Sequence, residues 1–382
     1  MLVVEMIRRG ALQFSDNGAV VFGDEEMTFR EVDLLSNRLA NVLMKDAGIA
    51  PRSRVGLLLN NSLHSIPLDF ALAKAQIARV PLNSRLAAAE HQLMLETAGV
   101  ELLIYDSALA ARANELAESM AHLRILCLQD QAGVAGLLAM SVAASDRPPG
   151  LSIGPDDVVL ALYTSGTTGT LKAAQHTQAT LAAIANNTLC NLIDVQAGES
   201  MLHAASLIHA SGMFVLPYWV RGGTAYVLPA FAPEQYLETI ARRRPTAINL
   251  VPTMLGMLLE RPGIESADLS SVKTIVYGAS PMPRATMERA LELWGPRFVQ
   301  YYGQTEAPLS ITVLRKEDHV GPGSYERLLA CGQPSVDCEV RLLDDDDREV
   351  APGESGEIVV RAPFGMIGYL DAPEINARTM LP

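Results

Sequence analysis

The feature that most constrains the fold is a regular alternation of short apolar runs with longer amphipathic ones. Apolar runs of strand length stand at residues 54–59, 79–82 and 102–105, and helix-like patterns separate them at 65–75 and 87–98. Strands that are apolar along their whole length are typical of parallel sheets whose two faces are both covered by helices. The pattern therefore predicts an α/β fold.

The alternation begins with a helix predicted over residues 27–45, in which Thr28 and Glu31 have the spacing of a capping box. Beyond a proline-rich break at residues 146–150 it resumes. Strands are predicted there at 158–162, 201–204, 224–228, 247–251, 272–277 and 297–302, with helices at 181–191, 213–220, 233–243 and 284–293.

From about residue 325 the pattern changes to short strands at 339–343 and 356–360. We therefore expect three units. The first is an α/β region over residues 1–150, and whether it intertwines with the next is left open. The second is an α/β region over 151–324, and the third a small β unit over 325–382.

Residues 163–172 have the composition of a loop that wraps a polyphosphate. Five hydroxyl residues and two glycines lie between Thr164 and Thr170, and Lys172 closes the stretch. Glycines let backbone N–H groups approach a ligand, hydroxyls donate to phosphate oxygens, and lysine adds a positive charge. The spacing is not that of a Walker A loop. A surface linker is the alternative, but linkers seldom follow an apolar strand and end in a lysine beside a helix-compatible run.

A second group of polar residues, 301–306, ends a predicted strand, and ligands bind at that edge of open parallel sheets. Glu306 offers an oxygen ligand suited to Mg²⁺. Thr305 offers a hydroxyl for a phosphate oxygen, and Tyr302 a ring on which a purine can lie. Taken alone, this stretch is also compatible with a structural turn.

Charge and cysteine usage exclude several classes of protein. The net charge is −13, which disfavours nucleic acid or an anionic membrane as the main partner. The four cysteines form no C-x-x-C pair, and no apolar run is long enough for a membrane span, so we expect reduced thiols in a cytoplasmic protein. The acidic run 344–347 lacks the spacing of an EF-hand loop and is interpreted as a solvated hairpin tip.

Together, these segments resemble the adenylate-forming superfamily of acyl-CoA synthetases, nonribosomal-peptide adenylation domains and luciferases. The matching landmarks occur in family order at residues 163–172, 207–212, 277–281, 301–306, and 356–358 with 368–370. The resemblance implies two packed, doubly wound and mostly parallel sheets with helices on their faces, followed by a small β-barrel-like unit.

The resemblance also assigns residues to roles. Residues implied in catalysis are Thr164, Lys172, His209, Thr305 and Glu306, of which Glu306 would bind the metal. Residues implied in nucleotide binding are Thr164, Ser165, Gly166, Thr167, Thr168, Gly169, Lys172, Gly278, Ala279, Ser280, Tyr301, Tyr302, Gly303, Gln304 and Thr305. Residues implied in binding the acid are His209, Gly212, Met213, Phe214, Tyr277 and Gly278. His176 is interpreted as structural.

The implied reaction uses ATP, Mg²⁺ and coenzyme A. A carboxylate attacks the α-phosphorus of ATP, giving an acyl-adenylate and pyrophosphate, and a thiol then displaces AMP. The segments flanking the acid are apolar, so we expect a hydrophobic monocarboxylic acid with a fatty, aryl or alicyclic body. Two alternatives stay open: transfer to a carrier-protein thiol or separate partner, and a non-catalytic nucleotide- or acyl-binding module. A homodimer is also left open.

Three departures from the family pattern stand out. Leu171 and Ala173 replace the usual proline and glycine, but neither change removes a donor. The sequence stops at Pro382, where the family continues into a Thr-Gly-Asp motif, a hinge and a lid domain with a lysine that assists adenylation. Either this is a fragment, or the lid was left out, or another chain provides it. From residues 1–382 alone, nucleotide or acyl-adenylate binding with poor turnover is therefore expected.

Overall fold

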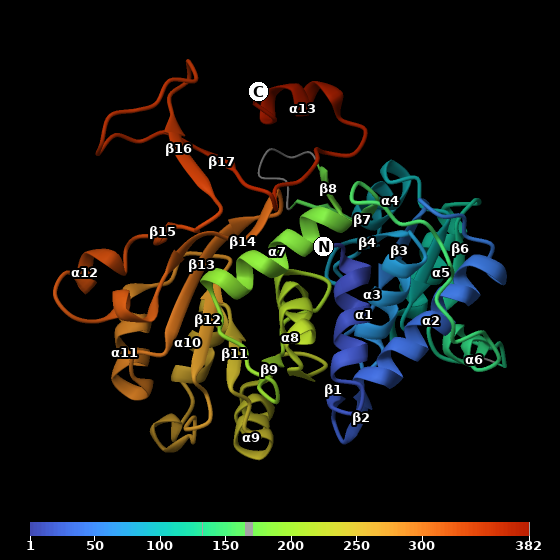
Figure 1. Cartoon of the computed structure of the whole chain (residues 1–382), viewed down its shortest axis with the longest axis horizontal. Coiled ribbons are helices and arrows are strands. Elements are labelled where there is room, and N and C mark those ends of the chain that lie inside the picture. The colour runs from blue at the N-terminus through green and yellow to red at the C-terminus, as the bar shows by residue number, and fades with distance from the viewer. Residues whose placement is uncertain (132, 165–170, 382) are drawn as a thin grey trace.

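The computed structural model describes residues 1–131, 133–164 and 171–381. Two β-sheets stand next to each other, with helices between them and on their outer faces (Figure 1). This arrangement confirms the predicted α/β class with two mostly parallel sheets. Among the residues described, no helix is long and apolar enough to cross a bilayer.

The smaller sheet has six strands in the order β6-β5-β3-β4-β7-β8. They are β3 (Arg54–Leu58), β4 (Ala78–Pro81), β5 (Leu102–Tyr105), β6 (Arg124–Cys127), β7 (Val158–Tyr163) and β8 (Ala173–Thr177). All neighbours are parallel except β7 and β8, which pair antiparallel at one edge. The predicted apolar runs at 54–59, 79–82 and 102–105 are confirmed as β3, β4 and β5, with ends that agree to one residue.

The larger sheet has nine strands in the order β15-β14-β13-β12-β11-β9-β10-β1-β2. They are β1 (Gly18–Phe22), β2 (Glu25–Thr28), β9 (Ser200–His203), β10 (Thr224–Val227), β11 (Ala247–Leu250), β12 (Thr274–Gly278), β13 (Phe298–Gln304), β14 (Ala307–Leu314) and β15 (Gln333–Pro334). The centre, from β13 to β1, is parallel, and antiparallel strands extend it at both edges.

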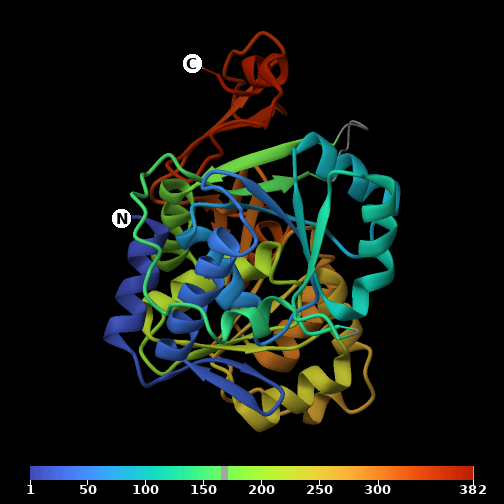
Figure 2. The ribbon, with the colours of Figure 1, turned by 90° about the vertical axis from the view of Figure 1, so that its right-hand side faces the viewer.

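Helices fill the space between the sheets and cover their other faces (Figures 1 and 2). Between them lie α1 (Val3–Gln13), α3 (Ser65–Lys74), α7 (Gln178–Asn191) and α8 (Val215–Arg221). One hydrophobic core there joins Val20 of β1, Val159 of β7 and Trp219 of α8. With α3, the helices α2 (Phe29–Lys45) and α6 (Leu137–Ser141) cover one face of the smaller sheet. Its other face packs on α4 (Ala88–Thr97) and α5 (Ala110–Ser119).

The face of the larger sheet that points away from the smaller sheet packs on α9 (Pro233–Arg243), α10 (Pro252–Leu259) and α11 (Arg284–Trp294). The capping box of α2 is confirmed: the Glu31 N–H donates to Thr28 Oγ1 (3.2 Å), and the Thr28 N–H donates to Glu31 Oε2 (2.8 Å). The run predicted as a helix at 213–220 divides into a 3₁₀ turn, η2 (Ala210–Phe214), and α8.

The two sheets do not follow the chain order of the predicted units. Strands β1 and β2, from the first 150 residues, belong to the larger sheet. Strands β7 and β8, which follow residue 150, belong to the smaller one. The break at 146–150 therefore lies between two strands of one sheet, β6 and β7.

The last part of the chain forms a hairpin that projects from the body, followed by a short helix (Figures 1 and 2). These elements are β16 (Glu339–Leu343), β17 (Glu357–Arg361) and α13 (Pro373–Thr379). The acidic run 344–347 follows β16 and is exposed, as expected for a solvated hairpin tip. A short helix, α12 (Ser324–Arg327), precedes β15.

Candidate functional site

The first part of the candidate site is the β7–β8 hairpin, which carries the predicted phosphate loop. The predicted residues Ser165, Gly166, Thr167, Thr168 and Gly169 lie outside the described residues. At its base, the Thr164 N–H donates to the Lys172 carbonyl at 2.9 Å. The loop therefore connects two antiparallel strands. No strand was predicted between the loop and the helix expected at 181–191. The structure has β8 there, and α7 begins at Gln178.

The second part is the β13–β14 hairpin. Gln304 pairs with Ala307, so Thr305 and Glu306 are the two central residues of a tight turn. A Cβ added to Gly303 would lie 2.2 Å from the Leu309 carbonyl oxygen, so only glycine fits there. Leu309 has a φ of 64°, a left-handed backbone that a bulky side chain rarely adopts. Local strain of this kind is often found at functional sites.

The two hairpins, one from each sheet, contact each other directly. His176 of β8 is fully buried, and its Nε2–H donates to the Thr305 carbonyl at 2.8 Å. Because a carbonyl can only accept, Nε2 carries the proton and the neutral ring leaves Nδ1 as an acceptor. Burial lowers the pKa of His176 to about 4, so the ring stays neutral near pH 7.

A segment near the end of the chain, residues 366–370, lies along β8 and reaches the second hairpin. The Gln175 N–H donates to Gly368 (3.0 Å), and the Leu370 N–H donates to Ala173 (2.9 Å). The Met366 N–H donates to the Glu306 carbonyl at 2.7 Å. Residues 368–370 of this segment were predicted as part of a family landmark, but none of them was predicted as part of the site.

Tyr369 of this segment contacts both hairpins. Its hydroxyl donates to Glu306 Oε1. The ammonium nitrogen of Lys172 lies 5.5 Å from the centre of its ring, within the range of a cation–π contact. The charged residues predicted in the two motifs therefore contact one tyrosine, Lys172 at its ring and Glu306 at its hydroxyl.

Glu306 is the residue predicted to bind Mg²⁺. Across the residues described, no three His, Cys, Asp or Glu side chains gather closely enough to hold a metal by themselves. Mg²⁺ in nucleotide sites is commonly held by one or two carboxylates together with phosphate oxygens and water. One half-buried carboxylate beside the base of a predicted phosphate loop fits that manner of binding.

The predicted adenine turn follows β12. A Cβ on Gly278 would lie 2.3 Å from the Tyr301 carbonyl oxygen and 2.9 Å from its ring, so glycine lets Tyr301 lie against this strand. The next residue, Ala279, has a φ of 69° and is exposed, as is Ser280. A strained, exposed turn at the carboxyl end of a central parallel strand is a suitable place for a ligand to contact the backbone.

The predicted acid-binding loop around His209 is shaped by close backbone contacts. A Cβ on Gly212 would lie 1.8 Å from the Leu207 carbonyl oxygen, so this turn requires glycine. Asn61 holds the loop from the side: it accepts from the Leu207 N–H (2.9 Å) and donates to the Ala205 carbonyl (3.1 Å). His209 is half-buried, and burial lowers its pKa, which favours a neutral imidazole. Asn61 was not predicted from the sequence.

The residues predicted to line the acid pocket do not all come together. Met213 and Phe214 are buried beside Tyr301, and the rings of Phe214 and Tyr301 are 5.9 Å apart. Tyr277 points to the opposite face of the sheet, where its hydroxyl bonds to His319 (2.9 Å). The structure therefore separates Tyr277 from the other predicted lining side chains.

Two buried polar atoms on the face that carries Phe214 have no hydrogen-bond partner among the described residues: Nε2 of His203 and the hydroxyl of Tyr301. The other ring nitrogen of His203 bonds to Ser211 Oγ at 2.9 Å. Burial raises the pKa of Tyr301 to about 12, although the nearby Asn249 side chain acts in the opposite direction, so its hydroxyl stays protonated near neutral pH.

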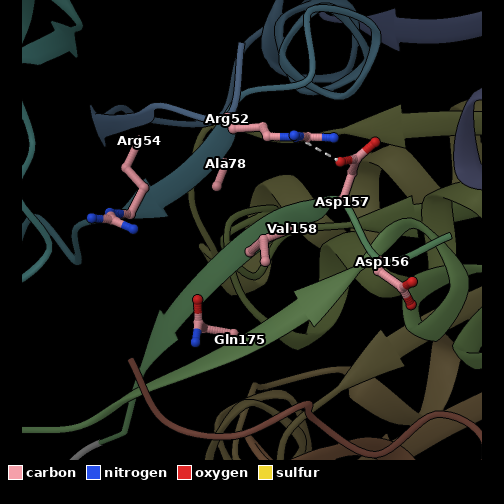
Figure 3. Close-up of a pocket in the computed structure, with 7 residues that line it drawn as sticks. All are labelled: Arg52, Arg54, Ala78, Asp156, Asp157, Val158 and Gln175. Carbon is pink, nitrogen blue, oxygen red and sulfur yellow. Dashed lines mark hydrogen bonds and ion pairs between the residues drawn. The ribbon is translucent and has the colours of Figure 1, made fainter. Parts of the chain in front are cut away.

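A cavity of about 290 Å³ lies away from these motifs, and the residues lining it are shown in Figure 3. Arg54, Ala78 and Val158 begin β3, β4 and β7, so it lies at the amino ends of the strands, opposite the end that leads to the phosphate loop. Its Arg52 is paired with Asp157 at 3.1 Å. The cavity contains none of the predicted site residues.

Comparisons with known proteins give a consistent result. A model of the AMP-binding enzyme family matches residues 7–370. A feruloyl-CoA synthase from an Amycolatopsis species is 38% identical over 367 residues, covering 95% of this chain and 70% of that protein. The medium/long-chain-fatty-acid–CoA ligase FadD8 of Mycobacterium tuberculosis is 34% identical over 382 residues, covering 97% and 66%.

Among solved structures, the inhibitor-bound N-terminal domain of FACL13 from Mycobacterium tuberculosis superimposes with a TM-score of 0.88. It is 27% identical and covers 98% of this chain and 92% of that one. The chain thus spans about two thirds of the length of the two curated relatives and nearly the whole of this single domain.

Proposed function

The chain belongs to the AMP-binding enzyme family, and on that premise we propose that it activates a carboxylic acid with ATP and then forms a thioester. In the first step, a carboxylate oxygen bonds to the α-phosphorus while the bond from that phosphorus to the bridging oxygen breaks. The products are an acyl-adenylate and pyrophosphate. In the second step, a thiolate attacks the acyl carbon and AMP leaves with the electron pair.

The observation that carries this proposal is the meeting of the two hairpins. Lys172 comes from the smaller sheet and Glu306 from the larger, and both contact Tyr369. A polyphosphate bound here would have the phosphate loop on one side and Thr305 and Glu306 on the other. That geometry suits a reaction in which positioned donors stabilise charge and no protein nucleophile is needed.

Each residue then has a role. Thr164 and Lys172, with the loop between them, would hold the leaving pyrophosphate. Thr305 would donate to the α-phosphate, and Glu306 would hold Mg²⁺, which neutralises phosphate charge when bound. Gly278, Ala279, Ser280 and Tyr302 would frame the adenine. His209, neutral near pH 7, would lie beside the carboxylate of the acid.

The acid is proposed to have a hydrophobic body, because Met213 and Phe214 are apolar and buried. The unpartnered polar atoms of His203 and Tyr301 lie on the same face of the larger sheet. Burying such atoms without a partner costs about 1–3 kcal/mol each. An oxygen substituent on that body that reached this face would give one of these atoms a partner, so an acid such as 4-hydroxycinnamic acid is favoured over its unsubstituted analogue.

The test is a pyrophosphate-release assay of the full natural protein with Mg·ATP and a panel of fatty, aryl and alicyclic acids. We expect release with at least one acid and its loss in Glu306→Gln. If no acid in a broad panel gives pyrophosphate or adenylate, the proposal is wrong, and ATP binding by calorimetry without chemistry would favour a non-catalytic binding module. Comparing coenzyme A with a phosphopantetheinyl carrier protein then identifies the thiol.

A further inference from the structure

Tyr369 is fixed in place by its own backbone and by its neighbours. Its side chain is 7% exposed, and its ring packs with Ala174 and Met366. Its N–H donates to Asn376 Oδ1 (2.7 Å), and the Asn376 amide donates back to its carbonyl (2.8 Å). The flanking Gly368 and Leu370 are both hydrogen-bonded to β8. The phenol therefore has little freedom to move away from Glu306.

This contact uses only part of the carboxylate. The hydroxyl donates to Oε1 of Glu306, while the backbone carbonyl of the same residue accepts from Met366. The other carboxylate oxygen, Oε2, has no hydrogen bond to a described residue and remains available to a ligand. A carboxylate held at one oxygen has a fixed direction for the other, which is how a neighbouring donor orients a metal ligand.

The same ring also contacts the phosphate-loop hairpin. Lys172 is the one cation at this ring in the described part of the chain, and an ammonium over a tyrosine face is attracted to its π electrons. A single side chain thus contacts the carboxylate on one hairpin and the ammonium on the other.

We propose that Tyr369 is a positioning residue of the adenylation site, holding Glu306 in the direction of the metal and Lys172 in the direction of the phosphates. The proposal rests on the proposed function. It attributes to Tyr369 an effect on metal-dependent nucleotide binding that simple packing of the segment would not produce. It also explains why the 366–370 segment is hydrogen-bonded to both hairpins.

The experiment compares Tyr369→Phe with the wild-type protein by titration calorimetry, using ATP with and without Mg²⁺. Phenylalanine keeps the ring, its packing and the lysine contact, and removes only the hydroxyl. Loss of a residue that orients a metal ligand typically weakens metal binding by about 10–100-fold. We expect about 10-fold weaker binding of Mg·ATP, with binding of metal-free ATP and the melting temperature little changed.

The matched control is Tyr105→Phe. Tyr105 is also 7% exposed, and its hydroxyl donates to Gln131 Oε1 at 2.8 Å, on β5 and away from both hairpins. We expect this variant to bind both forms of ATP like the wild type. In a Glu306→Gln background, Tyr369→Phe should have much less effect on Mg·ATP, because its action passes through that carboxylate.

Two further variants keep the test decisive. Tyr369→Leu removes the ring as well and should also weaken metal-free ATP, because Lys172 loses its platform. Asn376→Ala leaves the phenol intact but frees its backbone, so a smaller loss in Mg·ATP binding is expected even if Tyr369→Phe folds poorly. The inference is overturned if Tyr369→Phe and Asn376→Ala both bind Mg·ATP like the Tyr105 control. If the wild type binds no ATP at all, the proposed function itself has failed.

Discussion

The two hairpins at the candidate site place chemistry in opposite ways. The β7–β8 hairpin has many polar residues in the long connection between Thr164 and Lys172. The β13–β14 hairpin carries two groups, Thr305 and Glu306, on the shortest of turns. In the proposed site, several donors of the first hairpin bind the same phosphates. In the second hairpin, Thr305 and Glu306 each have a separate role.

The short turn needs outside support, and the structure provides it. Both of its carbonyls are used, one by His176 of the other hairpin and one by Met366. Gly303 and Leu309 form a close, strained contact behind it. A tight turn with few groups gives exact placement only if its surroundings hold it, whereas a long loop spreads the binding over many contacts. The following predictions test this difference.

The largest effect is expected on the short turn. Glu306→Gln keeps the size of the side chain and removes its charge. Among the described residues, no cluster of three or more potential metal ligands could take over metal binding. Removing one preorganised electrostatic group typically costs about 10²–10³-fold in rate. We expect a loss of that order in pyrophosphate release with a melting temperature close to wild type. A loss below tenfold would show that the turn does not act through one carboxylate.

Acidification should destabilise the protein through His176, whose side chain links the two hairpins by its hydrogen bond to the Thr305 carbonyl. The pKa of His176 is about 4 in the folded protein, below its usual 6.5, so the unfolded chain binds a proton that the folded one does not. The free energy of unfolding should therefore fall as the pH drops from 6.5 towards 4, by about 3 kcal/mol for this residue.

The measurement is urea unfolding between pH 7 and pH 4.5 for the wild type and His176→Gln. Glutamine can still donate to the Thr305 carbonyl but does not titrate. Its pH slope should be shallower than that of the wild type, with the buried His203, whose pKa is also about 4, left as a common background. Equal pH slopes for the two proteins would show that His176 does not contribute to the pH dependence of stability.

A methyl group behind the turn should cost somewhat less. In Gly303→Ala the new Cβ would meet the Leu309 carbonyl oxygen at 2.2 Å, so the backbone must shift. Overpacking of this kind costs about 1–3 kcal/mol. We expect a lower melting temperature together with weaker Mg·ATP binding. Gly256→Ala is the control, because nothing lies within 4 Å of its added methyl.

The smallest effect is expected on the long loop. In Lys172→Met the stem is kept and the charge is lost, but the loop offers other donors to the same phosphates. We expect about a tenfold loss in pyrophosphate release, roughly one 1.4 kcal/mol step. A loss as large as that of Glu306→Gln would show that the other donors of the loop cannot replace Lys172.

The sequence predicted the parallel strands well where their apolar runs are unbroken, as in β5 and β7. It missed β8, whose Ala-Ala-Gln-His-Thr run has little strand character, although it is pinned between β7 and the 366–370 segment. It also missed β14, where an Ala-Pro start follows the turn, although all eight residues are buried. Both strands owe their form to tertiary contacts, which local patterns do not record.

The residues of the candidate site were likewise predicted only in part. Lys172, Thr305 and Glu306 stand in recognisable motifs, so their proximity could be expected. Tyr369 and His176 act through contacts between segments that are far apart in the chain, and no spacing in the sequence shows which atoms they meet. Asn61 is similar, because its partners lie more than 140 residues away.

The pairing of β1 with β10 has a consequence for how the chain is made. Val20 and Ala225 are direct neighbours in the larger sheet, so this contact closes a loop of about 200 residues. As the chain leaves the ribosome, β1 and β2 wait without their partner strand until β10 has been synthesised. The helices of the first half are therefore expected to assemble early on the smaller sheet, and the amino-terminal hairpin to dock late, as the step that locks the two sheets together.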